Sequence, residues 1–438
     1  MSGLYDYRGT EFLAPDEIRK VQERLFRKHL EFLLANSPYY RRTLRGFDCG
    51  TASLELGNIT SLPFTDKTLF SEFNDDFLAV PMSRIVDIVL SSGTTGNPAR
   101  VMYTENDLQR LAYNEEISFL GCGLTPEDIV LLTCTIDRCF IAGLAYFSGA
   151  RSLGAAVIRN GLSSLESHLD IIRRIRPTVL IGVPTLLLKL GRYLLSRDVD
   201  PREMGVSKLI CIGEPVRDRA LALLKVGESI EEIWGAKAYS TYASSETITS
   251  FCECSCRQGG HLHPELAIVE IVDEKGRVLP TGETGEVVVT PLHIEGMPLL
   301  RYRTGDVSFL LDDRCGCGRN SPRLGPILGR KNQMIKFLGT TIYPNAIYAV
   351  LDEITGITEY CVEVSSNYDL SDIVKVYVSG NDTMCSSGII SERLQARLRV
   401  RPEVVVASGE EIRKMIFPGN SRKINHFVDR RTSDVNMP

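Results

Sequence analysis

The sequence lacks the apolar and basic segments that mark membrane and secreted proteins. No run of about 18 apolar residues occurs in its 438 residues, so no membrane-spanning helix is expected. Residues 1–20 contain no basic segment followed by an apolar one, which is the pattern of a secretory signal. We therefore predict a cytoplasmic protein with no membrane partner.

An excess of positive charge is also missing. Lys and Arg total 50 against 55 Asp and Glu, and no basic stripe or RNA-binding signature occurs. These features argue against a nucleic-acid partner. With 43% apolar residues, a chain of this length can bury a large core divided between two or three domains.

Cysteine is too sparse for a disulfide scaffold, but it is unevenly placed. The chain has 12 cysteines, well below the density of small domains that disulfides hold together. Five of them fall in two short segments, namely Cys252, Cys254, Cys256, Cys315 and Cys317. Their neighbours are charged residues, serine and glycine rather than the apolar runs in which buried cysteines usually lie. This clustering indicates a shared role.

The central part of the chain alternates between strand and helix patterns. After an amphipathic helix at 16–36, short buried strands are predicted at 129–133, 155–158, 178–182 and 208–213, with helices at 165–175 and 218–226 between them. Such alternation predicts a parallel or mixed sheet layered by helices, with ligands near the carboxyl ends of the strands. From 268 to 290 the pattern becomes β.

A second change in pattern occurs near residue 330. Helices are predicted at 345–354 and 389–400 and strands at 359–364, 373–379 and 403–407, which is a small α+β unit. The polar stretch GRKNQ at 329–333 has the composition of a hinge. We therefore predict a large α/β N-terminal domain with layered sheets and a β subdomain (1–331), followed by a small mobile α+β C-terminal domain (332–438).

The stretch SSGTTGNPAR at 91–100 combines small hydroxyl side chains with glycine. Such a loop suits an oxyanion such as phosphate, and an exposed polar turn is the alternative. Its flanks predict a buried strand at 84–90 and another at 101–103, followed by a helix whose capping box is Thr104 and Asp107. A Walker A loop would lead from strand into helix and continue with Lys after its last glycine. Here Gly96 is followed by Asn97 and Pro98, so any phosphate site belongs to another fold.

Five stretches occur in the order of the core motifs of adenylate-forming enzymes. They are SSGTTGNP (91–98), YASSET (242–247), RYRTGD (301–306), GRKNQMIKFLG (329–339) and SRKINHFVDRR (421–431). Among these enzymes the chain most resembles phenylacetate-CoA ligases and their relatives. NSPYYRR (36–42), LPFTDK (62–67), YTENDL (103–108) and IGVPTLLLKL (181–190) support that narrower match.

The resemblance implies an enzyme that activates a carboxylic acid with ATP and Mg²⁺ and passes the acyl group to CoA. Ser91, Ser92, Gly93, Thr94, Thr95 and Gly96 resemble the phosphate loop, and Gly213, Glu214 and Pro215 the loop beside the adenine. Tyr242, Ala243, Ser244 and Ser245 match nucleotide-binding positions, with Tyr242 as the wall of the adenine pocket and Ser245 as a phosphate-side hydroxyl. Glu246 matches the magnesium ligand, Asp306 the ribose-binding acid, Arg330 a nucleotide-contacting arginine and Lys423 the catalytic lysine. Taken singly, each could be an ordinary structural residue.

Four positions depart from the family pattern. Arg422 stands where glycine usually precedes the catalytic lysine, and Ala243 also replaces a usual glycine. In the hinge, Asn332 and Gln333 replace two acids, so a hinge is inferred there from position alone.

Some phenylacetate-CoA ligase relatives carry a zinc site, and the resemblance places it here at Cys254, His261, Cys315 and Cys317. Three thiolates and an imidazole would form a closed, structural tetrahedral site. Cys252, Cys256 or His263 could substitute for one ligand, and reduced, unliganded thiols are the alternative.

The acyl pocket is predicted within residues 137–150, at Phe140, Ala142, Gly143 and Tyr146, although these aromatic residues could equally be core. An aryl or other small organic acid is the expected substrate. Transfer to a carrier-protein thiol or another acceptor, and a non-catalytic nucleotide-binding module, remain alternatives. A homodimer is the assembly considered.

Overall fold

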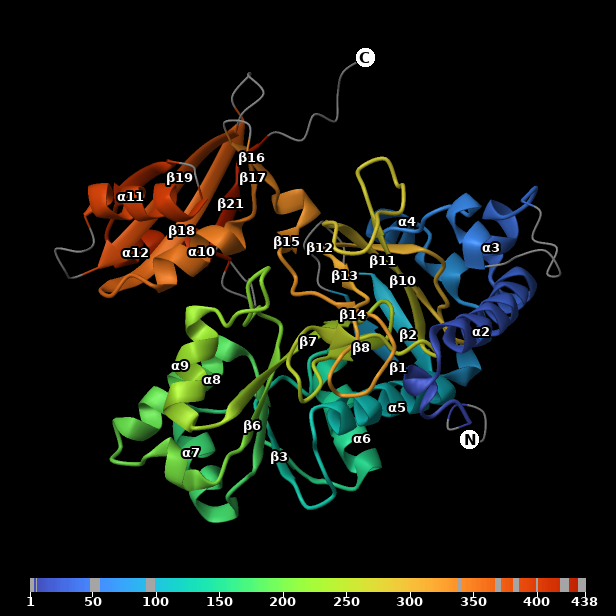
Figure 1. Cartoon of the computed structure of the whole chain (residues 1–438), viewed down its shortest axis with the longest axis horizontal. Helices are drawn as coiled ribbons and strands as arrows, with labels where there is room; N and C mark the ends of the chain where they lie inside the picture. The colour runs from blue at the N-terminus through green and yellow to red at the C-terminus, as the bar shows by residue number, and fades with distance from the viewer. Residues whose placement is uncertain are drawn as a thin grey trace. The chain divides into compact units, whose positions relative to one another are not determined.

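The computed structural model describes residues 4, 6–47, 56–91, 99–337, 340–366, 372–380, 386–398, 401–417 and 425–431 (Figure 1). The chain forms two compact units, which we call unit 1 (1–304 and 308–327) and unit 2 (305–307 and 328–438). The boundary predicted at 331/332 stays a prediction. Within the described residues, no helix is both long enough and apolar enough to cross a membrane.

The main sheet of unit 1 is largely parallel, as the alternating pattern predicted. Its strand order is β4-β3-β5-β6-β7-β8. The strands are β3 (Ile129–Leu132), β4 (Ala156–Arg159), β5 (Val179–Gly182), β6 (Lys208–Ile212), β7 (Lys237–Ser244) and β8 (Thr249–Cys252). Only β8 pairs antiparallel among these, against β7. The α/β fold class is therefore confirmed.

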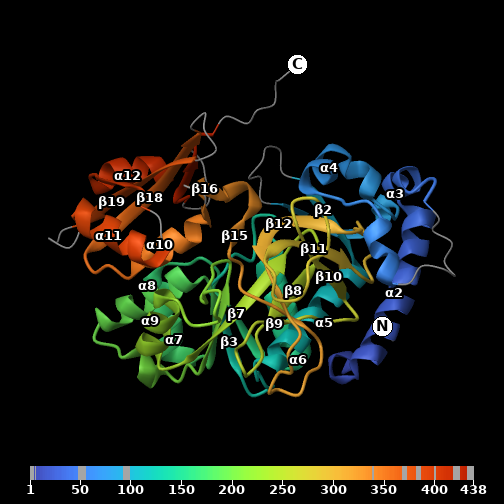
Figure 2. The same cartoon turned by 45° about the horizontal axis from the view of Figure 1, so that its top comes forward.

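Helices cover both faces of this sheet because its central strands β3 and β5 carry apolar side chains on both faces. Leu131, Leu180 and Leu209 pack against α7 (Leu165–Ile175), α8 (Pro184–Leu195) and α9 (Lys225–Trp234). The alternate residues, such as Val130 and Ile181, pack on the other face against α5 (Glu105–Gly121) and α6 (Ala142–Leu153). Figure 2 shows α7, α8 and α9 together on one side of β3 and β7. Such two-sided burial is typical of parallel sheets.

Two local predictions are wrong. The helix predicted at 218–226 is absent up to residue 224, because Asp218 and Ala222 close a turn through both backbone and side-chain hydrogen bonds. The helix α9 begins only at Lys225. The strand at 84–90 exists as β1 (Ile85–Leu90), but it is not buried, since Val86 is 54% exposed.

The first strand pair of unit 1 is preceded by the helices α2 (Pro15–Asn36), α3 (Pro38–Thr43) and α4 (Lys67–Glu72).

The smaller sheets of unit 1 contain antiparallel pairs. The strand β1 pairs antiparallel with β2 (Arg100–Thr104), and the capping box predicted at Thr104 and Asp107 opens α5. The predicted β region contains β10 (Ala267–Val272) and β11 (Gly285–Pro291) as an antiparallel pair. A small sheet has the order β13-β14-β9, from β9 (Gly260–His261), β13 (Leu310–Leu311) and β14 (Arg323–Leu324).

A carboxyl group is buried where α5 crosses α6. Gly149 of α6 lies so close to Glu115 of α5 that a Cβ added at Gly149 would be 2.2 Å from the Glu115 Cβ. Burial raises the pKa of Glu115 from 4.5 to about 7, although a hydrogen bond from Ser250 opposes the shift. One carboxylate oxygen of Glu115 has no hydrogen-bond partner.

Glu115→Gln is therefore expected to flatten the decline of stability with rising pH. In the unfolded chain this carboxyl loses its proton near pH 4.5, whereas in the fold it keeps the proton up to about pH 7. Stability should consequently fall as pH rises through that window, by at most about 3 kcal/mol. Melting temperatures measured from pH 5 to 8 should diverge between wild type and Glu115→Gln. Glu127→Gln, at an exposed position, is the control, and parallel profiles for wild type and Glu115→Gln would contradict the prediction.

Unit 2 has a four-stranded sheet of order β20-β19-β18-β21. Its strands are β18 (Ile357–Ser366), β19 (Asp372–Gly380), β20 (Glu403–Val406) and β21 (Phe427–Asp429), and its helices are α10 (Pro344–Asp352), α11 (Ser387–Leu398) and α12 (Gly409–Ile416). Valines of β18 and β19 form its core with α10 and α11. The helix α12 was not among the predicted elements, although the capping box formed by Ser408 and Glu411 marks its start.

An arginine at the end of unit 2 braces the segment predicted as a hinge. The guanidinium of Arg431 donates to the carbonyl of Asn332 at 3.1 Å and to that of Met334 at 2.7 Å. Asp372 and Asp429 hold the same guanidinium through ion pairs of 3.2 and 2.6 Å. The short 3-10 turn Lys331–Gln333 is thereby tied to the C-terminal strand β21.

Candidate functional site

Two groups of predicted nucleotide residues in unit 1 lie where β6 and β7 end. These two strands are parallel neighbours, with Ile212 paired to Thr241, so their carboxyl ends lie at one edge of the sheet. Gly213, Glu214 and Pro215 follow β6 directly, and Gly213 has a φ of 75°, which favours glycine. The YASSET residues form the end of β7 and the turn that leads to β8.

Glu246 occupies that turn and is largely buried, with 14% of its side chain exposed. Its Oε2 accepts a hydrogen bond from the Ser244 hydroxyl at 3.1 Å, and its Oε1 lies 3.9 Å from the Lys67 Nζ. The Tyr103 hydroxyl donates to the Ser245 carbonyl at 3.0 Å. Burial and the nearby Glu246 raise the pKa of Tyr103, so this phenol remains a donor.

The sequence analysis did not single out Lys67. The signal was present, since LPFTDK (62–67) is one of the stretches that carry the family resemblance. Asp66 caps α4 by accepting a hydrogen bond from the Leu69 N–H at 2.9 Å, so the helix begins at Lys67. The structure therefore places the Lys67 ammonium beside the carboxylate of Glu246, the predicted magnesium ligand.

Other nucleotide positions in unit 1 have structural contacts of their own. The Glu214 carboxylate accepts hydrogen bonds from the N–H and hydroxyl of Thr185, at 3.1 and 2.9 Å, at the start of α8. The ring of Tyr242 is half-buried and stacks at 6.4 Å from that of Phe251, while Ala243 is exposed.

Of the stretch at 91–100 that contains the predicted phosphate loop, only Ser91, Ala99 and Arg100 are described. Ser91 closes the β1–β2 pair, because its N–H donates to the Ala99 carbonyl at 2.9 Å and its hydroxyl accepts from the Ala99 N–H at 3.1 Å. Ser92, Gly93, Thr94, Thr95 and Gly96 lie outside the described residues, as does Lys423.

Asp306 and Arg330 form a pair within unit 2. They stand opposite each other in the antiparallel pairing of β12 (Tyr302–Ser308) with β15 (Gly329–Arg330). The Arg330 Nε lies 3.3 Å from the Asp306 Oδ1. Two positions predicted to contact the nucleotide are thus brought together by strand register.

The predicted acyl-pocket residues have different environments. Phe140 is 39% exposed, whereas Tyr146 is buried in the core between the sheet and the helices α5 and α6. Ala142 and Gly143 open α6, and a Cβ added at Gly143 would be 2.4 Å from the Thr135 carbonyl oxygen. Tyr146 therefore packs as a core residue, which was the alternative interpretation for these aromatic side chains.

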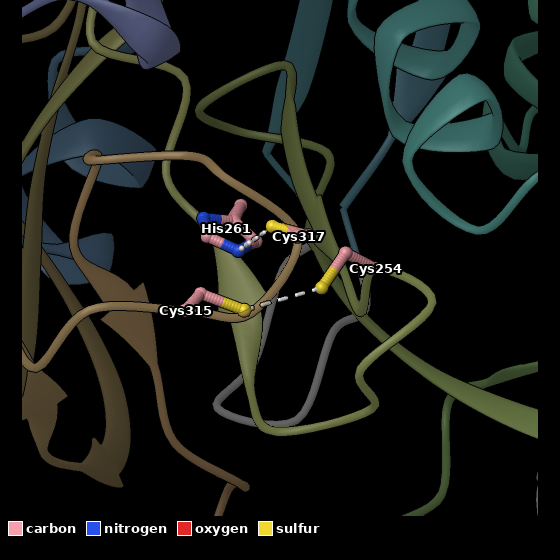
Figure 3. A group of neighbouring side chains, drawn as sticks. All are labelled: Cys254, His261, Cys315 and Cys317. Atoms are coloured by element: carbon pink, nitrogen blue, oxygen red, sulfur yellow. Dashed lines mark hydrogen bonds between the residues drawn. The ribbon is translucent and has the colours of Figure 1, made fainter.

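The structure brings the four predicted zinc ligands into one cluster (Figure 3). Cys254 follows β8, His261 lies on β9, and Cys315 and Cys317 lie on the loop between β13 and β14, which we call the cysteine loop (312–322). Their ligand atoms all lie within 4.8 Å of one another. Figure 3 shows the sulfurs and the imidazole turned toward a common centre.

The spacing of these atoms fits a tetrahedral metal site. The sulfurs of Cys254 and Cys315 are 3.6 Å apart, and the Cys317 sulfur is 3.3 Å from the His261 Nε2. Ordinary zinc bond lengths give tetrahedral edges of about 3.8 Å between two sulfurs and about 3.5 Å between sulfur and nitrogen. Burial lowers the pKa of His261 to about 4, so the imidazole is neutral at pH 7.

The three alternative ligands have other surroundings. The Cys252 sulfur accepts a hydrogen bond from Thr241 at 3.1 Å. His263 contacts the Ser118 hydroxyl at 3.0 Å through its Nε2. Cys256 lies beside the cluster, where its N–H donates to the Cys254 sulfur at 3.4 Å.

Comparison with known proteins identifies the family. The profile of the AMP-binding enzyme family matches residues 58–294. Phenylacetate-coenzyme A ligase of Thermus thermophilus is 33% identical over 349 residues, which are 78% of this chain and 76% of that protein. The enzyme of the same name from Pseudomonas putida is 30% identical over 377 residues, covering 84% of this chain and 83% of that protein.

Solved structures agree on the fold. A 2-hydroxyisobutyryl-CoA ligase in complex with R3-HIB-AMP superposes with a TM-score of 0.83 at 22% identity, over 96% of this chain and 91% of that one. ATP-bound MatB of Rhodopseudomonas palustris gives a TM-score of 0.59 at 19% identity, over 75% of this chain and 65% of that one. The chain therefore belongs to the AMP-binding enzyme family and, within it, to the phenylacetate-CoA ligase family of adenylate-forming, AMP-producing acid–thiol ligases.

Proposed function

We propose that this ligase activates an aryl or similarly small organic acid as its acyl-adenylate and then transfers the acyl group to CoA. The observation that carries the proposal is the joint placement of the 213–215 loop and the YASSET turn, with Glu246, at the carboxyl edge of β6 and β7. Ligands of α/β proteins bind at that edge. The similarity to phenylacetate-CoA ligases supports the choice of acid.

The reaction proceeds in two displacements. A carboxylate oxygen of the acid attacks the α-phosphorus of ATP and pyrophosphate leaves. The thiol sulfur of CoA then attacks the acyl carbon, its proton is lost to solvent, and AMP leaves with the former carboxylate oxygen. Because the first step gathers several negative charges, positioning and electrostatic stabilisation should dominate catalysis.

Residues of unit 1 would hold the phosphates and the metal. Carboxylate oxygens suit Mg²⁺, and Glu246 offers two, one of them already beside a cation. When bound, Mg²⁺ would neutralise phosphate charge. We infer that Lys67 shares that task, since its ammonium lies at the same carboxylate. Residues 92–96 and Ser245 complete the proposed phosphate side, while Gly213, Glu214, Pro215, Tyr242, Ala243 and Ser244 complete the adenine side.

Two residues of unit 2 would bind the rest of the nucleotide. The Asp306 carboxylate can accept hydrogen bonds from both ribose hydroxyls. Arg330, already paired with Asp306 at 3.3 Å, would orient this carboxylate and contact the nucleotide. Lys423 is proposed as the cation that reaches the carboxylate and α-phosphate during adenylation.

The test is a product assay over a panel of aryl and short aliphatic acids. Release of AMP and pyrophosphate, with an acyl-CoA thioester formed only when CoA is present, is the expected result for at least one aryl acid. An adenylate that is passed to a carrier-protein thiol but not to CoA would overturn the assigned acceptor. Absence of magnesium-dependent pyrophosphate exchange with every acid would overturn catalysis itself.

We further propose that Cys254, His261, Cys315 and Cys317 bind one structural zinc ion. The support is the tetrahedral spacing of their ligand atoms within a buried site. Sulfur and imidazole ligands suit zinc, and a fourfold protein ligand set leaves no position for water. The metal would join the cysteine loop to the segment after β8.

Purified protein is expected to contain about one zinc ion per chain, as a structural site requires. Removal by a chelator should lower the melting temperature by several degrees, because metal binding adds to folding free energy. Cys315→Ser should lose the zinc, whereas Cys139→Ser, at an exposed cysteine outside the cluster, should retain it. Metal-free protein with an unaltered melting temperature would refute the site.

A cytoplasmic location and a homodimer also stay proposals. Cell fractionation tests the first, and light scattering coupled to size-exclusion chromatography tests the second.

A further inference from the structure

The cysteine loop is hydrogen-bonded to a segment near the start of the sequence. The backbone N–H groups of Asn320 and Ser321 both donate to the Glu11 carbonyl, at 2.7 and 3.1 Å. The Asn320 side chain donates to the Phe12 carbonyl and to the next one along, each at 3.1 Å. Residues 7–13, which we call the N-terminal segment, therefore lie directly against the loop that carries two of the proposed zinc ligands.

One buried ion pair connects this segment to the side of the cysteine loop next to Cys317. The Arg319 Nε donates to the Glu11 Oε1 at 2.7 Å, and the two side chains are only 11% and 8% exposed. Arg319 itself stands on the cysteine loop, two residues after the proposed ligand Cys317. Phe12 supports the arrangement, because the guanidinium lies 4.8 Å from the centre of its ring.

A second contact orients the imidazole ligand. The His261 Nδ1 lies 3.1 Å from the Ser321 hydroxyl. This contact leaves the Nε2 directed toward the Cys317 sulfur, as Figure 3 shows. Hydrogen bonds of this kind fix the tautomer and ring orientation of metal-bound histidines.

Charge explains why a cation is buried beside the cluster. Three thiolates around a divalent zinc ion leave one net negative charge in a buried site, which would be costly without compensation. Arg319, which is only 11% exposed, supplies one positive charge on the loop that carries Cys315 and Cys317. Glu11 pairs with the Arg319 guanidinium, so Arg319 is held in place by the N-terminal segment.

We propose that Arg319 and Glu11 form the outer shell of the Cys254, His261, Cys315 and Cys317 zinc centre, so that zinc binding and docking of the N-terminal segment are coupled. Arg319 acts as a positioning residue that stabilises the Cys317 thiolate, and Glu11 orients Arg319. The inference rests on the zinc centre proposed above. By linkage, loss of either outer residue weakens zinc binding, and loss of zinc loosens residues 7–13.

The experiment uses the full chain in zinc competition with a coloured chelator. Arg319→Gln and Glu11→Gln are expected to bind zinc about 10- to 100-fold more weakly than wild type, the usual effect of losing an outer-shell partner. Arg319→Lys should restore part of the affinity, because it keeps the charge but not the fork of donors. The matched controls Arg173→Gln and Glu232→Gln alter exposed residues of α7 and α9 and should bind zinc as wild type does.

Hydrogen exchange of the wild-type chain tests the coupling without any variant. Amide protection of residues 8–13 should fall on zinc removal, while protection of α7 should not change. Wild-type zinc affinity in both Arg319→Gln and Glu11→Gln would overturn the outer shell, and unchanged protection of residues 8–13 would overturn the coupling. Wild-type protein that binds no zinc would instead refute the centre itself, a separate outcome that the wild-type titration reports.

Discussion

Glu246→Gln is expected to lower magnesium-dependent ATP–pyrophosphate exchange about 10²- to 10³-fold, the size of effect seen when one electrostatic group is removed from a transition state. The amide keeps the shape of the side chain but removes the charge that favours Mg²⁺. It also leaves Lys67, 3.9 Å from Oε1, facing a neutral group. Exchange is measured over a range of magnesium concentrations, because weaker metal binding should be partly overcome at high magnesium.

Two controls keep this result interpretable. Glu203→Gln, at an exposed position of unit 1, should retain wild-type exchange. The melting temperature of Glu246→Gln should stay near that of wild type, since glutamine keeps the size of the side chain and its amide oxygen can still accept the hydrogen bond from Ser244. Full exchange at ordinary magnesium would remove Glu246 from the site.

Lys423→Ala is expected to separate the two half-reactions. Formation of the acyl-adenylate should slow at least about 10²-fold, because the cation that offsets charge on the carboxylate and α-phosphate is lost. Transfer from a chemically prepared acyl-adenylate to CoA should remain largely intact, since that step carries less charge. Single-turnover measurements of pyrophosphate release and of thioester formation follow the two steps independently.

The complementary variant is Asn332→Pro in the hinge segment. A fixed proline ring should stiffen the joint and slow thioester formation more than adenylation. Equal slowing of both steps in both variants would indicate a shared folding defect and would contradict a division of the cycle between Lys423 and the hinge.

The fold was predictable where strands carry apolar residues at successive positions. The strands β3, β5 and β6 were located to within one residue at either end because burial on both faces leaves an unbroken apolar run. The helix at 218–226 failed because tertiary contacts override local propensity there. Arg217 is drawn into the interior by an ion pair with Glu253 at 2.5 Å, and the chain turns directly after it.

Sequence motifs predicted only those residues of the candidate site that stand inside the motifs. Residues such as Glu246 and Asp306 could be named because they stand inside short stretches of recognisable spacing. Lys67 could be given no role in this way, since its carboxylate partner is 179 residues further along the chain. Glu11 and Arg319 are 308 residues apart, so no local pattern connects them. Pairing between distant segments is set by packing of the whole unit.

The hydrogen bonds of Arg431 restrict backbone rotation in the segment that follows β15. Antiparallel pairing with β12 fixes the backbone as far as Arg330, and the guanidinium ties the carbonyls of Asn332 and Met334 to each other. Twisting the chain between those two carbonyls would break charge-assisted hydrogen bonds, which resist torsion far more than a bare peptide does. Backbone rotation that preserves both the β12 pairing and the Arg431 hydrogen bonds is therefore restricted to Lys331 and Asn332, which lie between the two fixed points.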